Sequence, residues 1–417
     1  MVLFYILLFV GSLVLTYNKY HSLLKINFIY TLIWCLGAIL VSLSYGKLYT
    51  ITDNVHLYII LSIITVNIFY FLNNVEVSGD YSIRWEISHL NYQVIVLGSL
   101  LSYIFMLPIT YRAIRIILSS GWFELRSYAY SASSMASAGQ LLIYSWIINP
   151  LFSATFLLTS ILWFSKSKYK RTLMLLSIID LMIITITFGG RYNIVKFILF
   201  FISAFQFYRS FKGQKNKIKL KYIILGFCIG ALLIYMTSLR SLKGLSAIQN
   251  VFVYFFGSIV YFSLIITDGY SPLNSTKLYG NATFGLFTSI PMYLYYQVSK
   301  RNYTPEYLID QTSNDFLYIS PGYRYNAFTT WLFPFWKDFG IIGIIIGSAF
   351  VFYLFCRLKR KLICKGELSS FVLLVYVSYV ILTSTLSYNM ITIQQTVTIL
   401  FSLFLSRESY QIDSNEE

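Results

Sequence analysis

The chain has 417 residues, of which 57% are hydrophobic, 19% aromatic and only 12% charged. Soluble domains carry charge on about a quarter of their residues, so this composition excludes a soluble globular protein. Apolar stretches of roughly 17 to 25 residues recur along the chain, which is the length that crosses a hydrocarbon core of about 30 Å. The alternating pattern of an outer-membrane barrel is absent. We therefore predict an all-α, polytopic membrane protein that forms a single domain over residues 1–417.

The net charge of +16 could indicate a nucleic-acid partner. Most of the excess lies in three short basic runs, Lys166 to Arg171, Arg209 to Lys221 and Arg357 to Lys365, with four, six and five cations. None of these runs contains an acid. Basic loops mark the cytoplasmic side of a membrane and face anionic headgroups. We therefore predict membrane lipids and no nucleic acid as partners of these cations.

The first half of the chain contains five predicted spans. The N-terminus lacks a basic n-region and a small-residue cleavage site, so the first apolar stretch is predicted to be a retained span. The five run from Val2 to Thr16, Ile26 to Tyr45, Val55 to Leu72, Tyr92 to Thr110 and Gly139 to Phe164.

A short turn, Phe188-Gly189-Gly190-Arg191, joins the next two predicted spans, Thr172 to Phe188 and Tyr192 to Tyr208. Both outer ends of this pair are basic, so both are predicted to lie in the cytoplasm. The turn must then lie on the opposite side. Topology does not explain an arginine there, and Arg191 indicates an anionic ligand outside the cytoplasmic leaflet.

The remaining predicted spans leave the total at 11 or 13. Two stretches are ambiguous, Ile248 to Thr267 and Phe284 to Val298, because proline interrupts the second. By parity they both cross or both stay outside, which places residues 299–338 in a large external loop and residues 407–417 in a short cytoplasmic tail. The other spans run from Tyr222 to Leu239, Phe339 to Phe355, Leu368 to Leu386 and Met390 to Leu405.

Four arginines fall on the external side, one in each of four separate segments: Arg126, Arg191, Arg240 and Arg324. Guanidinium groups bind phosphate oxygens bidentately and keep their charge at any relevant pH. The alternative is that each is an interfacial anchor reaching to the headgroups. For Arg191 we favour a ligand, because two adjacent glycines permit close backbone approach.

Other chemistry has less support in the sequence. The three histidines lie outside the large external loop and are predicted to be structural, no cluster has metal-ligand spacing, and no nucleotide-binding loop occurs, so neither metal nor cofactor is predicted. Among the external carboxylates Asp338 is the most distinctive, since it directly precedes a predicted span. It could act as an acid or base, or cap the helix that follows.

Three passages resemble the oligosaccharide repeat-unit polymerases of bacteria (the Wzy type). In that family a long external loop closes with an N-x-[YF]-T…D-F-G-x-x-G passage that enters a late span. The corresponding residues here are Glu124-Leu125-Arg126, Gly189-Gly190-Arg191, Asn326-Ala327-Phe328-Thr329 and Asp338-Phe339-Gly340-Ile341-Ile342-Gly343.

The resemblance implies a GT-C-like architecture in the bacterial inner membrane, with its active face in the periplasm. It implies a metal-independent glycosyltransferase that joins undecaprenyl-diphosphate-linked repeat units into O-antigen or capsular polysaccharide. Arg191 and Arg240 would hold the diphosphates, with Arg126, Arg324 and Asn326 in support and Asp338 as a structural or catalytic acid. A flippase and a chain-length regulator of the same pathway would be partners.

Three alternatives remain open on sequence alone. An O-antigen ligase shares the architecture, although an external histidine is expected there. A lipid-linked oligosaccharide flippase usually carries charges inside its spans, in two similar halves. Here ionisable residues within the predicted spans are few, with Asp180 and Lys196 the clearest, and the external loop is long. A structural protein of polysaccharide export would have no activity.

Overall fold

The computed structural model describes residues 1–76, 85–130, 135–165, 167–190, 192–211, 246–267, 276–313, 316–325, 328–407 and 410–411. It is mostly helical, as the sequence predicts. Among these residues, seven helices are long and apolar enough to cross a membrane, and three shorter apolar helices accompany them. This fits a polytopic membrane protein. The predicted span Tyr222 to Leu239 lies outside the described residues, so the total of 11 or 13 stays a prediction.

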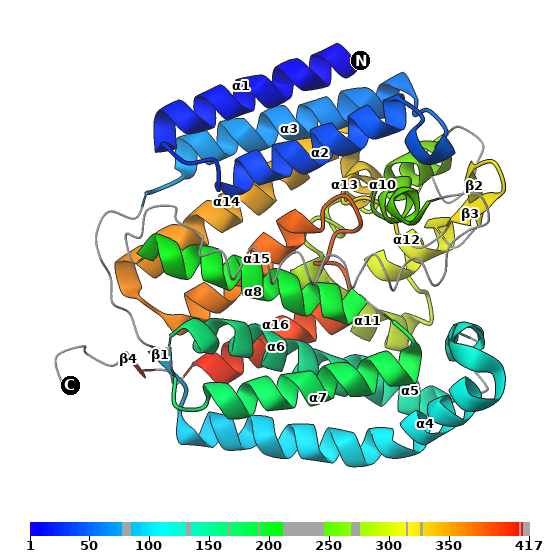
Figure 1. The fold of residues 1–417 in the computed structure, drawn as a ribbon, viewed down its shortest axis with the longest axis vertical. Helices are drawn as coiled ribbons and strands as arrows, with labels where there is room; N and C mark the ends of the chain where they lie inside the picture. The colour runs from blue at the N-terminus through cyan, green and yellow to red at the C-terminus, as the bar shows by residue number, and fades with distance from the viewer. Residues whose placement is uncertain are drawn as a thin grey trace. The chain divides into compact units, whose positions relative to one another are not determined.

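The chain divides into two compact units, and each is described here by itself. Unit 1 comprises Met1–Asn74, Lys215–Leu354 and Val380–Thr392. Its described elements, drawn in Figure 1, are α1 (Val2–Tyr20), α2 (Ile26–Ser42), η1 (Tyr45–Lys47), α3 (Asp53–Asn73), α10 (Ala247–Ile265), α11 (Gly285–Ser299), α12 (Pro305–Ser313), β2 (Leu317–Ser320), β3 (Tyr323–Tyr325), α13 (Leu332–Phe339) and most of α14 (Ile341–Lys365).

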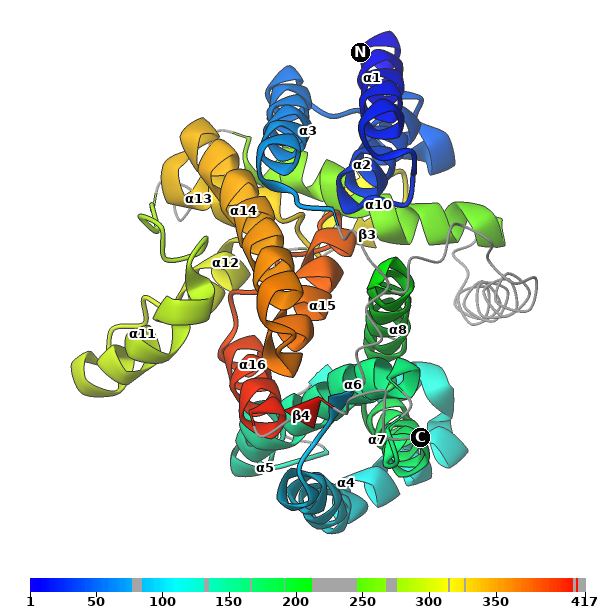
Figure 2. The same cartoon turned by 90° about the vertical axis from the view of Figure 1, so that its left-hand side faces the viewer.

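Hydroxyl groups join the helices of unit 1. The helices α1, α2 and α3 lie side by side in both views (Figures 1 and 2). The buried Tyr30 of α2 shares a hydrogen bond of 2.7 Å with Ser62 of α3, and Ser62 shares one of 2.6 Å with Ser348 of α14. Between membrane helices the hydrophobic effect is weak, so such bonds and close packing hold the bundle together.

Unit 2 comprises Val75–Gln214, Phe355–Tyr379 and Ile393–Glu417. Its described elements are β1 (Trp85–Glu86), α4 (His89–Tyr130), α5 (Ala138–Ile143), the π-helical segment η2 (Tyr144–Ile148), α6 (Asn149–Phe164), α7 (Lys170–Phe188), α8 (Tyr192–Phe211), the end of α14, most of α15 (Leu368–Leu382), α16 (Ile393–Ser406) and β4 (Tyr410–Gln411).

The helix α6 forms the core of unit 2. Every residue from Asn149 to Leu162 is buried, and α4, α7, α8 and α16 pack around it. Thr159 of α6 shares a hydrogen bond of 2.8 Å with Ser177 of α7. Within the predicted tail, β4 pairs antiparallel with β1.

Three stretches that lie outside or at the ends of the predicted spans contain regular secondary structure. The linker after Thr110 is helical, because α4 continues to Tyr130 and breaks its helical geometry only at Gly121, where φ is +85°. The large loop 299–338 contains α12, β2, β3 and α13. In the basic run after Arg357 the chain stays helical to Lys365, since lysine, arginine and leucine all favour helix.

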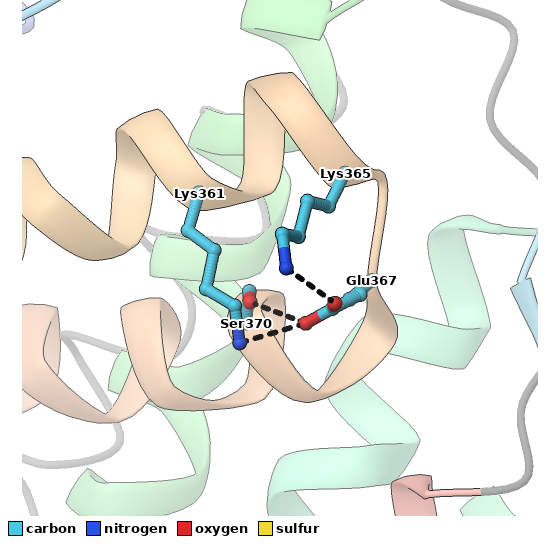
Figure 3. A network of polar contacts seen from close by, with 4 residues as sticks. All are labelled: Lys361, Lys365, Glu367 and Ser370. Carbon is cyan, nitrogen blue, oxygen red and sulfur yellow. Dashed lines mark hydrogen bonds and ion pairs between the residues drawn. The ribbon is translucent and has the colours of Figure 1, made fainter.

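The corner between α14 and α15 shows how this basic run is partly neutralised (Figure 3). Lys361 lies 2.8 Å and Lys365 lies 3.8 Å from the carboxylate of Glu367, which also accepts a hydrogen bond from Ser370. The hydrogen bond from Lys361 is the main cause that lowers the pKa of Glu367. The acid that partly compensates the run therefore lies two residues beyond the end of α14.

Candidate functional site

The candidate site in unit 1 is built around Asp338, near the end of α13. Its side chain is fully buried, with 0% exposure. One carboxylate oxygen accepts a hydrogen bond from the amide of Ala282 at 3.1 Å. The other accepts two bonds of 2.6 Å, from the amide and the hydroxyl of Thr283. The carboxylate thus fastens the end of the large loop to a segment more than fifty residues earlier.

These amides precede α11, whose N-cap is Phe284. A helix N-terminus has unpaired N–H groups and a partial positive charge, so a carboxylate beside it is stabilising. The predicted cap of the following span is therefore wrong, because Asp338 bonds the entry of α11 and the next helix, α14, begins only after Gly340. Its place in the sequence suggested that Asp338 caps α14, whereas the fold brings the start of α11 to its carboxylate.

Two opposing effects act on the acidity of Asp338. Burial raises the pKa of its carboxyl, while the hydrogen bonds from Thr283, Ala282 and Gly280 lower it. Burial is the larger effect, and the pKa is raised overall. A carboxyl with so many protein donors and no exposed surface is built to hold the chain together.

Further contacts hold residues 278–283, the segment that precedes α11. The amide of Leu278 donates to the carbonyl of Lys337 at 3.1 Å, and the hydroxyl of Tyr388 donates to the carbonyl of Thr283 at 2.8 Å. The Tyr388 ring packs edge-on against Phe335, with centroids 4.8 Å apart. Residues 278–283 are therefore held both by α13 and by the loop before α16.

The glycines of the D-F-G-x-x-G passage have structural explanations. Gly340 has φ +63° and ψ −135°, a conformation that side chains rarely adopt. A Cβ on Gly343 would lie 1.9 Å from the carbonyl oxygen of Phe335, and one on Gly347 would lie 2.4 Å from the Phe335 ring. The passage thus lets α13 turn sharply and pack directly on α14.

Two lysines at Trp336, its neighbour Lys337 in the sequence and Lys277 over its ring, were not among the candidate residues of the sequence analysis. The ammonium of Lys277 lies 4.6 Å from the centroid of the Trp336 ring, and Lys337 is fully buried. Burial first, and then the charge of Lys277, lower the pKa of Lys337 to about 8. The run Trp336-Lys337-Asp338 is visible in the sequence, but the proximity of Lys277 is not.

Arg324 is the predicted arginine that the structure describes most fully. It lies on β3, which pairs antiparallel with β2 so that Arg324 is opposite Tyr318. The guanidinium carbon is 5.0 Å from the centroid of the Tyr318 ring, and both side chains are exposed. A cation over an aromatic face is attracted to the ring, by about 0.5–1 kcal/mol at an exposed site, so this hairpin places a cation and an aromatic ring side by side on its exposed face.

In unit 2 the predicted turn between two helices is confirmed. Gly189 ends α7 in the left-handed conformation with φ +63°, and its amide donates to the carbonyl of Thr185 at 2.9 Å. A Cβ on Gly190 would meet nothing within 4 Å. Gly189 therefore serves the helix end, and packing imposes no glycine at the second position.

The convergence of the four arginines stays a prediction. Arg191, Arg240 and Asn326 lie outside the described residues, and for Arg126 only the backbone, within α4, is described.

Two helices of unit 2 carry an acidic or basic side chain within a predicted span, and one of the two side chains is buried. Asp180 of α7 is fully buried and accepts a hydrogen bond of 2.7 Å from Tyr103 of α4 on one oxygen, while its other oxygen has no hydrogen-bond partner among the described residues. Lys196 of α8 donates to the hydroxyl of Ser153 at 3.1 Å. Intramembrane charges of this kind are costly and often functional.

Known proteins give no further guide to the site. Neither a family model, nor a curated protein, nor a solved structure matches this chain.

Proposed function

We propose that the protein is a bacterial repeat-unit polymerase that joins undecaprenyl-diphosphate-linked oligosaccharides into O-antigen or capsular polysaccharide. It would work in the inner membrane, with its reacting groups on the periplasmic face. A flippase would supply the lipid-linked units and a chain-length regulator would limit the product. The enzyme is a glycosyltransferase whose donor carries its own leaving group.

The observation that carries the proposal is the clamp formed by Asp338. The passage that most resembles these polymerases is D-F-G-x-x-G at residues 338–343, and its aspartate and both of its glycines have a structural role here. Asp338 bonds the segment before α11, Gly340 makes the turn and Gly343 permits contact with Phe335. A loop closed this firmly can present side chains at fixed positions beside a span, as preorganised binding requires.

The chemistry would rest on the arginines. Arg191 and Arg240 would bind the diphosphates and stabilise the charge that develops as the glycan leaves its lipid carrier. Preorganised cations contribute most to such a step in a water-poor site. Arg126 and Arg324 would help to hold the lipid-linked substrates, and Asp338 would position the loop.

The aromatic surface of the hairpin supports an oligosaccharide substrate. Tyr318 is 47% exposed and Tyr303, on the same loop, is 46% exposed. Rings on a membrane protein often form an interfacial belt, but Tyr318 also has the guanidinium group of Arg324 over its ring. An exposed ring offers a flat apolar face to the C–H side of a sugar.

The test is an Arg191→Ala variant expressed in a strain that lacks the gene. Loss of the arginine removes charge stabilisation, so we expect glycans of a single repeat instead of a ladder of lengths. Arg209→Ala, at the basic end of α8, is the matched control and should restore the ladder. Surface glycans resolved by gel and lipid-linked glycans resolved by mass spectrometry provide the readout.

Other outcomes distinguish the alternatives. A normal ladder from a membrane-inserted Arg191→Ala protein would refute the assigned role of this residue. In the gene deletion, full-length glycan retained on its lipid carrier indicates a ligase, and single repeats trapped at the cytoplasmic face indicate a flippase. Single repeats transferred to their final acceptor support the polymerase.

A further inference from the structure

The helix α11 carries an apolar stripe that is largely exposed, and no described residue of its own unit covers it. Phe287, Leu294 and Val298 are 65%, 60% and 87% exposed. These residues, with Phe284 and Pro291, follow one another at intervals of three or four positions. That spacing places all of them on one face of a helix. In Figure 2 the helix projects from α12 and α13.

The opposite face of α11 is anchored. Gly285 and Ser289 are buried, and a Cβ on Gly285 would lie 2.7 Å from the carbonyl oxygen of Met390. Asp338 holds the amides just before the helix. Because the backbone packs so closely on one side, the helix cannot rotate, and the apolar stripe must face outward.

The helix is too short to cross a membrane. Its fifteen residues span about 22 Å, against a hydrocarbon core of about 30 Å. Pro291 interrupts it, and it is not among the candidate spans or the shorter apolar helices of the described residues. This is the segment that the sequence left ambiguous between crossing and staying outside.

Its ends and edges match the membrane surface. Tyr295, at the edge of the stripe, is 53% exposed, and tyrosine is favoured at the headgroup level. The helix ends at Ser299, and the next residue, Lys300, adopts a left-handed conformation and is followed by Arg301; both cations are exposed. Two adjacent cations at the end of an apolar stripe complement anionic headgroups.

We propose that α11 is an interfacial helix that lies in the plane of the bilayer. Its stripe is buried at the boundary between headgroups and acyl chains, and Lys300 and Arg301 contact anionic headgroups. The occupant of the exposed face is therefore lipid. The helix supports the loop that follows it at a fixed depth, whatever reaction that loop performs.

The test measures depth along the helix. The full-length protein, with its four native cysteines replaced, is spin-labelled in turn as Phe287→Cys, Leu294→Cys and Val298→Cys. It is reconstituted into vesicles with equal parts of phosphatidylethanolamine and phosphatidylglycerol. The depth of each label is then obtained from its accessibility to oxygen, which partitions into the bilayer, and to a water-soluble nickel chelate. A label at Gln297→Cys, which lies off the stripe, is the matched control.

An interfacial helix gives three similar, shallow depths and a water-accessible control. A spanning helix gives depths that change by about 16 Å between residues 287 and 298, because each residue rises about 1.5 Å, and that result overturns the proposal. Strong chelate access at all three stripe positions also overturns it, since lipid then does not cover the face. Dipolar broadening between labels on different molecules would instead assign the face to a second copy.

The cations are tested by the double substitution of Lys300→Gln and Arg301→Gln. In the labelled protein that keeps Lys300 and Arg301, the label at residue 298 should move towards water when the phosphatidylglycerol of the vesicles is replaced by phosphatidylcholine. In the double variant this lipid dependence should vanish. An identical lipid dependence in both proteins overturns the headgroup contact.

Discussion

Each unit contains a fully buried aspartate, and the two are satisfied very differently. Asp338 of unit 1 accepts hydrogen bonds on both oxygens, from Ala282 and Thr283. Asp180 of unit 2 accepts one from Tyr103 on one oxygen and none from the described residues on the other. A buried polar group is stabilising only when it is paired, and an unpaired one costs free energy. Asp338 is therefore expected to stabilise its unit more than Asp180 stabilises its own.

The largest expected effect is that of Asp338→Ala. The change leaves two amides and one hydroxyl without their acceptor, each costing about 1–3 kcal/mol. We expect the free energy of unfolding to fall by about 3 kcal/mol or more, measured by denaturant titration in detergent micelles. Asp338→Asn keeps one acceptor oxygen and should lose less. Equal stability of the alanine variant and the unaltered protein would show that the clamp is not structural.

A smaller loss is expected for Tyr103→Phe. The phenyl ring preserves the packing between α4 and α7 but leaves Asp180 without its donor. The removal of one hydrogen bond to a buried acceptor costs about 1–2 kcal/mol. The same titration measures it, with Tyr111→Phe on an exposed position of α4 as the matched control. An unchanged unfolding free energy would mean that the bond contributes nothing to folding.

The decisive contrast is Asp180→Asn. Asparagine retains an oxygen for Tyr103 and removes the carboxyl, whose second oxygen is unpaired. Replacement of an imperfectly paired buried charge is often neutral or stabilising, so the unfolding free energy should change by less than about 1 kcal/mol. A loss as large as that of Asp338→Ala would erase the difference between the two aspartates. Loss of activity at unchanged stability would give Asp180 a functional role.

The smallest effect is expected for Glu367→Gln. Glu367 is partly exposed and serves as a reference for the two buried aspartates. Surface ion pairs contribute about 0–1 kcal/mol and are screened by salt. Since the hydrogen bond from Lys361 lowers the pKa of Glu367, its contribution exists above the ordinary glutamate pKa and is lost as pH falls through the lowered value. Thermal unfolding at neutral and acidic pH should therefore differ slightly between variant and unaltered protein, and high salt should abolish the difference.

The sequence predicts the helices of this protein better than the contacts of its site. Apolar length alone placed the helices α1, α2, α3, α7 and α8 to within a few residues. Of these, α1, α3 and α7 are long and apolar enough to cross a membrane, α2 is a shorter apolar helix, and the predicted span at α8 is not among the candidate spans. It also singled out Asp338. It did not identify Ala282 and Thr283 as its partners, because no periodicity links residues more than fifty positions apart.

The loops were harder to predict for a physical reason. Charge was interpreted as a sign of loop structure, yet lysine and arginine are good helix formers, so α14 continues through the basic run to Lys365. The four arginines could be assigned to one side of the membrane by parity. Whether they meet depends on tertiary packing, which neither charge nor hydropathy encodes.

The clamp also has a consequence for the order of synthesis. Thr283 and Asp338 are 55 residues apart, and the chain is made from its N-terminus. When α11 emerges, the carboxylate that stabilises its entry does not yet exist. The elements α12, β2, β3 and most of α13 are synthesised between α11 and Asp338. A membrane surface that binds the apolar stripe therefore does so before Asp338 forms its hydrogen bonds with the segment before α11. The hydrogen bonds of Asp338 thus form late in the synthesis of the protein and stabilise a helix that is already complete.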